Sequence, residues 1–146
     1  MTLADIILRL GAATLIGGLI GLNRYAHHKS IGLRTLGLVA LGSAAIVAAI
    51  DGGPDATAAS RAIQGLITGI GFIGAGVIMR DDSKHKVHGL TTATTVWVSA
   101  LVGVLCGLGA WQVTAVMVVL MAIVLLLGGS VEKKLVRTRV DDDEPP

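Results

Sequence analysis

The chain of 146 residues is 53% hydrophobic and only 15% charged, and its formal net charge is +2. A soluble domain of this size needs a largely polar surface, and this chain has too few polar residues to cover one. Aromatic residues make up 3% of the chain, which argues against a stacking platform for nucleic acid. The single cysteine, Cys106, excludes an intramolecular disulfide framework. The composition therefore indicates an integral membrane protein.

Five apolar stretches are long enough, or nearly so, to cross a bilayer as helices of roughly 20 residues. They are Leu3–Leu22, Leu36–Ile50, Ala62–Met79, Leu90–Leu108 and Ala110–Gly128. The first begins without the basic region of a secretory signal, so we interpret it as a retained transmembrane helix. Thr2 and Asp5 fit a capping box at its start, and Arg9 is close enough to Asp5 to pair with it. We expect an all-α polytopic membrane protein with about five transmembrane helices.

Two junctions in this series carry further information. The second stretch is short for a span unless its helix begins near Ile31. The last two stretches are separated by little more than Gly107, Gly109 and Trp111. This spacing predicts a hairpin turn, with the tryptophan at a membrane interface.

Basic residues are concentrated in alternate connections between these stretches. If five helices cross the membrane, ten of the twelve basic residues lie on one side. They are Arg24, Lys29, Arg34, Arg80, Lys84, Lys86, Lys133, Lys134, Arg137 and Arg139. The opposite side carries Arg61 together with Asp51 and Asp55, and Arg9 lies near it. The positive-inside rule then places the N-terminus outside and the C-terminus in the cytoplasm.

The chain divides into one membrane domain and one tail. Residues 1–129 form the expected transmembrane domain, and residues 130–146 form a charged segment that ends in an acidic block. A charge block of this kind is typically solvated and disordered. We therefore expect a disordered cytoplasmic tail and no second folded domain.

The third stretch is unusually rich in glycine. Gly69, Gly71 and Gly74 have the spacing of a dinucleotide fingerprint, but the flanking strand and the acidic residue that such a site needs are missing. Glycine at this density in an apolar helix favours close approach of another backbone. The alternative is that these glycines and Gly76 break the helix and expose carbonyl groups, as in transporters. The same close-approach spacing recurs at Gly17 and Gly21, Gly65 and Gly69, and Gly103 and Gly107.

Hydroxyl side chains gather at the start of the fourth stretch. After Gly89 come Thr91, Thr92, Thr94, Thr95 and Ser99. Helical spacing places Thr92, Thr95 and Ser99 on one face. This face is either a polar path for an ion or a set of hydrogen bonds between helices. No Asp or Glu lies at the centre of a predicted span, which argues against a conventional cation pathway.

The histidines all fall in the two connections expected on the cytoplasmic side, at His27, His28, His85 and His88. His85 and His88 would share one side of a helical turn and could bind a metal or sense pH. The favoured interpretation is interfacial basic residues, because no cysteine or carboxylate is suitably spaced with them. No nucleophile and base are visible together. We therefore expect no metal, no cofactor and no enzymatic activity.

Three blocks of sequence, in this order and on alternate helices, resemble the MgtC/SapB family of bacterial inner-membrane proteins. The blocks are GGLIGLNRYAHHKSIGLRTLGLVALG, TGIGFIGAGVIMR and VHGLTTATTVWVSALVG, within about Gly17–Gly109. In the family the first block usually begins Gly-Leu-Glu-Arg, and here Asn23 occupies the acidic position while Arg24 matches. The family's Gly-Leu-Arg-Thr motif is intact at Gly32–Thr35, followed by Leu36 where histidine is frequent.

The candidate functional residues follow from these blocks. They are Asn23, Arg24, Gly32, Arg34, Thr35, Gly69, Gly71, Gly74, Gly76, Gly89, Thr91, Thr92, Thr95 and Trp97. Arg24 and Arg34 are expected either to bind a lipid phosphate or a partner's acidic loop, or to anchor helix ends.

The resemblance implies a plasma-membrane protein linked to survival at low magnesium and, in some relatives, to virulence. The better-known members look like regulators, although magnesium transport was the earlier label. Members usually carry a cytoplasmic C-terminal domain, and the resemblance here is to the form without it. The leading hypothesis is a regulator that binds another membrane complex. Formation of a homo-oligomer is a further possibility. The alternatives are a cation transporter or channel lined by Thr91, Thr92 and Thr95, and a sensor built on the histidines.

Overall fold

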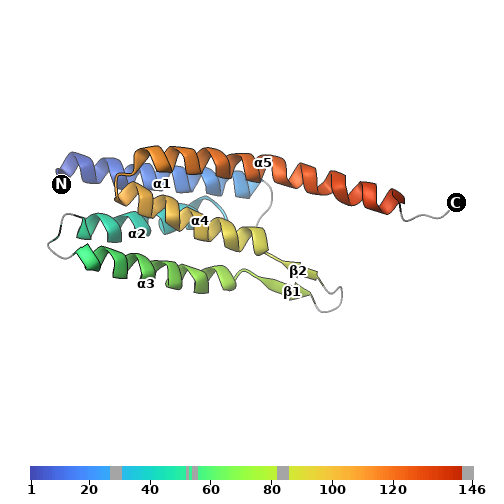
Figure 1. The fold of residues 1–146 in the computed structure, drawn as a ribbon, viewed down its shortest axis with the longest axis horizontal. Coiled ribbons are helices and arrows are strands. Elements are labelled where there is room, and N and C mark those ends of the chain that lie inside the picture. Colours follow the sequence, from blue (N-terminus) through green and yellow to red (C-terminus); the bar gives the residue numbers. More distant parts are fainter. Residues whose placement is uncertain (27–30, 52, 54–55, 82–85, 143–146) are drawn as a thin grey trace.

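The computed structural model describes residues 1–26, 31–51, 53, 56–81 and 86–142. These residues form five helices and one two-stranded antiparallel hairpin (Figure 1). The elements are α1 (Leu3–Ala26), α2 (Leu33–Ile50), α3 (Ala56–Ala75), β1 (Met79–Asp81), β2 (Lys86–His88), α4 (Leu90–Gly107) and α5 (Trp111–Asp142). The expected all-α fold is therefore confirmed.

The five helices lie side by side along the long axis of the molecule (Figure 1). The N-terminus, the end of α2 and the turn between α4 and α5 are at one end of this bundle. The end of α1, the start of α2 and the β1–β2 hairpin are at the other end, where α5 extends beyond its neighbours. Helix α4 is central, because it contacts α1, α2, α3 and α5.

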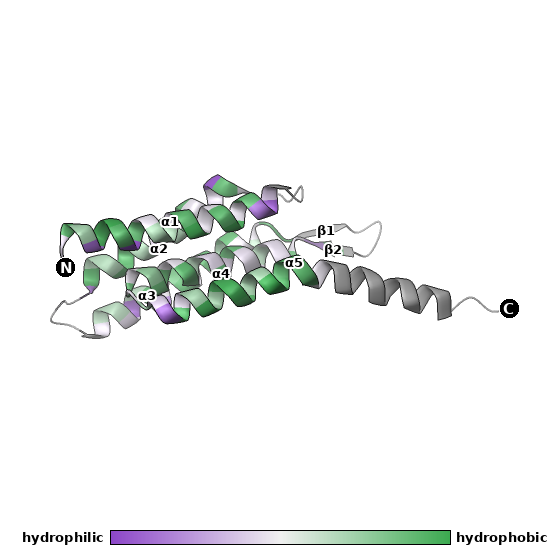
Figure 2. Cartoon of the chain, turned by 90° about the horizontal axis from the view of Figure 1, so that it is seen from above, coloured by the Kyte–Doolittle hydropathy of each residue, from purple (hydrophilic) through white to green (hydrophobic). Residues whose placement is uncertain are grey.

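Four of the described helices are long and apolar enough to cross a membrane, by length and composition. They are Leu3–Tyr25, Leu33–Ile50, Leu90–Gly107 and Trp111–Gly129. Helix α3 is not among them, and the polar residues Arg61 and Gln64 lie in its first half. In Figure 2 much of α1 and of α5 up to residue 129 has the colour of hydrophobic residues. Exposed apolar side chains on these helices include Leu15, Leu19, Leu120 and Val124, as expected for contact with lipid.

The third predicted span is displaced towards the N-terminus. Helix α3 begins at Ala56 instead of Ala62 and ends at Ala75 instead of Met79. After it, the N–H groups of Gly76, Val77 and Ile78 donate to the carbonyl groups of Phe72, Gly74 and Ala75, which closes a turn. The chain then enters β1, so residues 79–88 include a hairpin that the sequence did not predict.

This hairpin also corrects the prediction for the histidines. His88 lies in β2, where it pairs with Met79, and is therefore not part of a helical turn. His27, His28 and His85 themselves lie outside the described residues. Within the described part of the chain, no group of three or more metal-ligating side chains could hold a metal ion.

The tight junction between the last two helices is confirmed. Gly109 has a φ of 69°, a left-handed conformation that glycine adopts without strain. Its N–H donates to the carbonyl of Cys106 at 2.9 Å, and the N–H of Ala110 donates to that of Leu105 at 2.9 Å. Trp111 follows at the start of α5.

Helix α5 continues beyond residue 129 to Asp142 without a break. The division into a membrane domain and a disordered tail from residue 130 stays a prediction, and residues 143–146 lie outside the described part of the chain. Helix α2 begins at Leu33, between the two starting points that the sequence left open.

The capping box at the start of α1 is confirmed. The N–H of Thr2 donates to Asp5 Oδ2 at 3.2 Å, and the N–H of Asp5 donates to Thr2 Oγ1 at 3.2 Å. Arg9 is near enough to Asp5 to act on it electrostatically, as predicted, but its ion pair is with Asp51. Arg9 Nη1 lies 2.6 Å from Asp51 Oδ2 and donates to the carbonyl of Gly107 at 2.7 Å. It therefore joins the ends of α1, α2 and α4.

Candidate functional site

Glycines allow α1, α2 and α4 to pack with their backbones in contact. A Cβ atom at Gly17 would lie 2.6 Å from the carbonyl oxygen of Leu36, and one at Gly21 would lie 2.6 Å from that of Gly32. A Cβ at Gly107 would lie 2.7 Å from the carbonyl oxygen of Ala44. Real Cβ atoms do not approach so closely, so a side chain at these positions would separate the helices.

The glycines of α3 are in a different situation. A Cβ atom at Gly65, Gly69 or Gly71 would have no neighbouring atom within 4 Å, and one at Gly74 would lie 3.5 Å from the carbonyl oxygen of Ala93. Helix α3 is continuous through all four, so the predicted alternative of a broken helix is wrong. Gly76 lies in the turn that follows.

Phe72 lies on the same face of α3 as Gly65 and Gly69, by helical spacing, and is 85% exposed. We call these three residues the open face of α3. Glycine has a low helix propensity, so it needs a packing partner to be favoured over alanine. The chain described here supplies no such partner on this face.

A buried arginine connects α1 to α4. Arg24, in the last turn of α1, is 6% exposed, and its Nη2 donates to Thr92 Oγ1 at 2.9 Å. Its Nε is buried without a hydrogen-bond partner among the described residues. A cation in the last turn also faces the negative end of the helix dipole. The sequence placed Arg24 in a loop, so its burial was missed.

The hydroxyl face of α4 points into the bundle, as its spacing predicted. Thr92, Thr95 and Ser99 are buried, at 5%, 3% and 0% exposure. Thr95 Oγ1 donates to the carbonyl of Thr91 at 2.6 Å, whereas Ser99 Oγ has no partner among the described residues. Thr91 itself is exposed, and it lines a cleft against α5 together with Thr94 and the buried Thr95. Thr95 therefore belongs both to the buried hydroxyl face and to this cleft.

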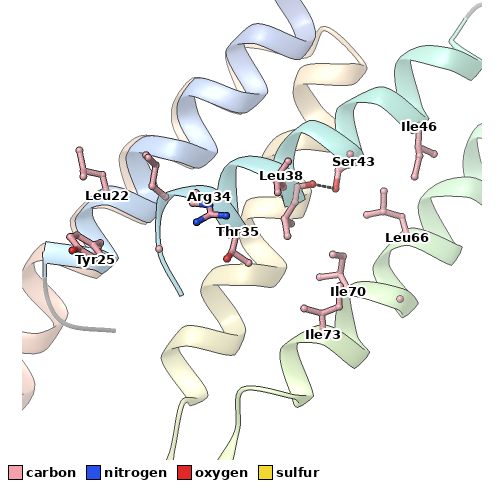
Figure 3. Close-up of a pocket in the computed structure, with 15 residues that line it drawn as sticks. Leu22, Tyr25, Arg34, Thr35, Leu38, Ser43, Ile46, Leu66, Ile70 and Ile73 are labelled. Carbon is pink, nitrogen blue, oxygen red and sulfur yellow. Dashed lines mark hydrogen bonds between the residues drawn. The ribbon is translucent and has the colours of Figure 1, made fainter. Parts of the chain in front are cut away.

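An open groove of about 940 Å³ lies between α2 and α3. Its lining includes Gly32, Arg34 and Thr35 from the start of α2, together with Leu22 and Tyr25 from α1. The remaining lining residues are Leu33, Leu38, Val39, Gly42, Ser43, Ile46, Leu66, Gly69, Ile70 and Ile73. Figure 3 shows the arginine at the end of the groove near α1, with the aliphatic side chains extending away from it along α2 and α3.

The other predicted residues belong neither to the contact between Arg24 and Thr92 nor to the groove. Asn23 is half-buried beside Arg24 in the sequence. Gly89 has a φ of 92° at the start of α4, and a Cβ there would overlap the carbonyl oxygen of Val77. Trp97 is 39% exposed on the outside of α4. These residues have separate structural settings.

Sequence reasoning missed the contact of Arg9 with Asp51 and the apolar walls of the groove. The ion pair had a usable signal, because opposite charges stood at the same predicted end of two helices. The groove had none, since its walls are ordinary aliphatic residues of two spans.

Together, the fold and its long apolar helices define a polytopic helical membrane protein. The MgtC family model matches residues 10–134, and the chain belongs to the MgtC family. Protein MgtC of Salmonella typhimurium strain LT2 is 44% identical over 129 residues, covering 86% of this chain and 54% of that protein.

Two further relatives agree with this assignment. Protein SrpB of Synechococcus elongatus is 43% identical over 116 residues, covering 71% of this chain and 64% of that protein. Protein MgtC of Brucella abortus strain 2308 is 45% identical over 100 residues, covering 68% and 41%. The chain thus spans about half the length of the MgtC proteins it matches. No solved structure matches the chain.

Proposed function

We propose that this chain is a non-enzymatic regulator in the bacterial plasma membrane that acts by binding another membrane complex. The expected setting, low magnesium or intracellular stress, follows from the family resemblance. The observation that carries the proposal is the open face of α3, where a Cβ atom added at Gly65 or Gly69 would meet no atom of another described element within 4 Å. Small residues at this spacing form a surface on which a second transmembrane helix packs closely.

The contrast within the chain supports this interpretation. The glycine pairs of α1 and α4 are filled by the backbone of α2, so close packing is how this bundle uses such pairs. The pair in α3 has the same spacing and no internal partner. A helix of another membrane protein would complete it.

Cation transport is disfavoured by the buried arginine. The guanidinium of Arg24 is bonded to Thr92 at the start of the hydroxyl face that would line a path. A fixed positive charge there repels a cation, and the ion pair between Arg9 and Asp51 lies at the opposite end of the bundle. The geometry therefore favours a packing role for the hydroxyl groups.

The proposed orientation is N-terminus outside and C-terminus in the cytoplasm. The end of α1, the β1–β2 hairpin and the extension of α5 lie at one end of the bundle, and they border or contain most of the basic residues (Figure 1). Positive loops are retained in the cytoplasm.

Photo-crosslinking in native membranes tests the proposed partner surface. A benzophenone derivative of phenylalanine at Phe72 should form an adduct with another membrane protein. Gly65→Leu in the same chain should abolish that adduct, because it fills the open face, whereas Gly128→Leu on α5 should not. Both positions have no neighbour within 4 Å, which makes them matched controls. Adducts with copies of this chain alone would contradict the proposal.

Flux measurements separate regulation from transport. Proteoliposomes that contain only the purified, folded protein should show no magnesium or proton flux above empty vesicles. Flux that falls on Thr92→Val and Thr95→Val would establish transport along the hydroxyl face and overturn the regulatory proposal.

A further inference from the structure

We propose that the groove between α2 and α3 binds one anionic phospholipid, with its phosphate at Arg34 and an acyl chain along the groove. This inference concerns a ligand of the bilayer itself. The groove and the open face of α3 share one residue, Gly69, whereas Gly65 and Phe72 lie outside the groove lining. It rests on the charge at the groove's mouth, the groove's length and the chemistry of its walls.

The mouth of the groove is suited to a phosphate. Arg34 and Thr35 are both exposed in the first turn of α2. Among the described residues, no side chain caps the first turn of α2. The first N–H groups of a helix also have no acceptor within the helix itself. Arginine binds phosphate with two parallel hydrogen bonds, and the positive end of the helix dipole adds to the attraction.

The segment that carries this arginine has no acidic residue. Residues 23–35, from the end of α1 to the start of α2, contain no Asp or Glu and include Arg24, Lys29 and Arg34. Among the described residues, the ion pair is at the other end of the bundle, between Arg9 and Asp51. The mouth is therefore positive, which favours an anionic headgroup over a zwitterionic one.

The walls of the groove fit an acyl chain. Leu38, Val39 and Ile46 line it on α2, and Leu66, Ile70 and Ile73 line it on α3 (Figure 3). The hydroxyl of Ser43 is already bonded to the carbonyl of Val39 at 2.8 Å, so it presents no free donor. A chain of CH₂ groups is the ligand that leaves no polar group unsatisfied here.

The length of the groove corresponds to one leaflet. Arg34 and Ile46 are twelve residues apart on α2, a span of about 18 Å at the rise of an α-helix. The hydrocarbon core of a bilayer is about 30 Å thick, so each leaflet contributes roughly 15 Å. A lipid with its phosphate at Arg34 would extend its acyl chain to about the midplane. Tyr25 at the mouth, 70% exposed, has the amphipathic character typical of this interface.

Native mass spectrometry of the purified full chain tests the site. The protein is titrated with dioleoyl phosphatidylglycerol and with dioleoyl phosphatidylcholine, which share acyl chains and differ in charge. Both lipids carry a phosphate that Arg34 can bind, but the positive choline group of phosphatidylcholine is repelled by the basic segment at the mouth. We therefore expect one phosphatidylglycerol to be retained about tenfold more tightly than phosphatidylcholine. Equal retention of the two lipids would overturn the proposal.

Variants assign the retained lipid to the groove. Arg34→Gln should remove the preference for phosphatidylglycerol, whereas Arg139→Gln, which removes the same charge from the end of α5, should not. Gly42→Leu should weaken both lipids, because Gly42 lines the groove and a Cβ there meets nothing within 4 Å. Gly128→Leu, with equal space, is its control.

Two further outcomes would reject the lipid as the occupant. Unchanged phosphatidylglycerol binding in Gly42→Leu would place the lipid elsewhere on the protein. Dissociation of an oligomer by Gly42→Leu, seen in the same spectra, would show that a second copy fills the groove.

Arg34→Lys should retain part of the preference for phosphatidylglycerol, because it keeps the positive charge and loses only the bidentate geometry.

Discussion

At the scale of single residues, the buried guanidinium of Arg24 has the most demanding environment in the described structure. It is a charged group at 6% exposure, and the side chain that satisfies it is the neutral hydroxyl of Thr92. A buried charge without an opposite charge is stabilised only by hydrogen bonds and dipoles. The bond between these two residues is therefore central to the contact between α1 and α4.

We predict that Thr92→Val destabilises the protein by about 1–3 kcal/mol, because it keeps the shape and removes the acceptor from a buried charged donor. Thr94→Val is the matched control. Its hydroxyl is exposed and bonds only to the carbonyl of Leu90 in its own helix. Reversible unfolding in mixed micelles measures both. Equal stability of the two variants would show that Arg24 has other sufficient partners.

Substitution of glycine by alanine should have different effects on stability at the packed glycines of α1 and at the open face of α3. Gly21→Ala would place a Cβ 2.6 Å from both the carbonyl oxygen of Gly32 and the Cα of Leu33. Backbone atoms cannot move aside as a side chain end can, so we predict a loss of about 1–3 kcal/mol. Gly65→Ala should be neutral or stabilising by up to about 1 kcal/mol, from helix propensity alone. The same unfolding assay compares them.

At the scale of elements, Arg9 joins three helix ends at the side opposite the hairpin. It bonds to Asp51 after α2 and to the carbonyl of Gly107 at the end of α4. The Gly107 carbonyl is one of the groups that a helix terminus leaves unsatisfied. The arginine thus caps α4 while it holds α1 against α2.

We predict that Asp51→Asn lowers stability by no more than about 1 kcal/mol, because the pair is partly exposed. The side chains are 18% and 37% exposed, so salt should screen the interaction. Added salt should therefore reduce the difference between wild type and variant. A difference that does not change with salt would indicate that packing, and not charge, is responsible.

The sequence predicted the helices better than their partners, and particular residues explain why. Apolar length identified five helices, and the small-residue spacing pointed correctly to Gly17 and Gly103 as close contacts. Gly65 has the same spacing but makes no such contact. The spacing of small residues shows that a helix can be approached closely, but it does not identify the neighbouring helix. Arg9 was assigned to Asp5, four residues away, because bonds across 42 residues need the fold to be known.

The candidate site shows the same limit. The family motifs located Arg24, Arg34 and Thr92, but not that the first is buried against the third while the second lies at a groove. Two arginines ten residues apart have similar local sequence. Their difference comes from the direction of α1 and α2 where they meet, which is a tertiary property.

At the scale of the whole molecule, the proposed orientation gives a direct prediction. In a Cys106→Ala background, Gln112→Cys at the start of α5 should react with an impermeant maleimide in intact cells. Val87→Cys in β2 should react only after permeabilisation. Both side chains are exposed, and they lie near opposite ends of the bundle. The reverse pattern of labelling would show that the N-terminus is cytoplasmic.

The modest apolarity of α3 has a consequence for how the chain enters the membrane. Its neighbours α2 and α4 can each partition into lipid from a translocon by their own composition, whereas α3 has Arg61, Gln64 and an uncovered row of glycines. The emergence of α4 from the ribosome supplies both a strongly apolar neighbour and a packing surface at Ala93. We therefore expect stable integration of α3 to depend on α4, although α4 is synthesised after it.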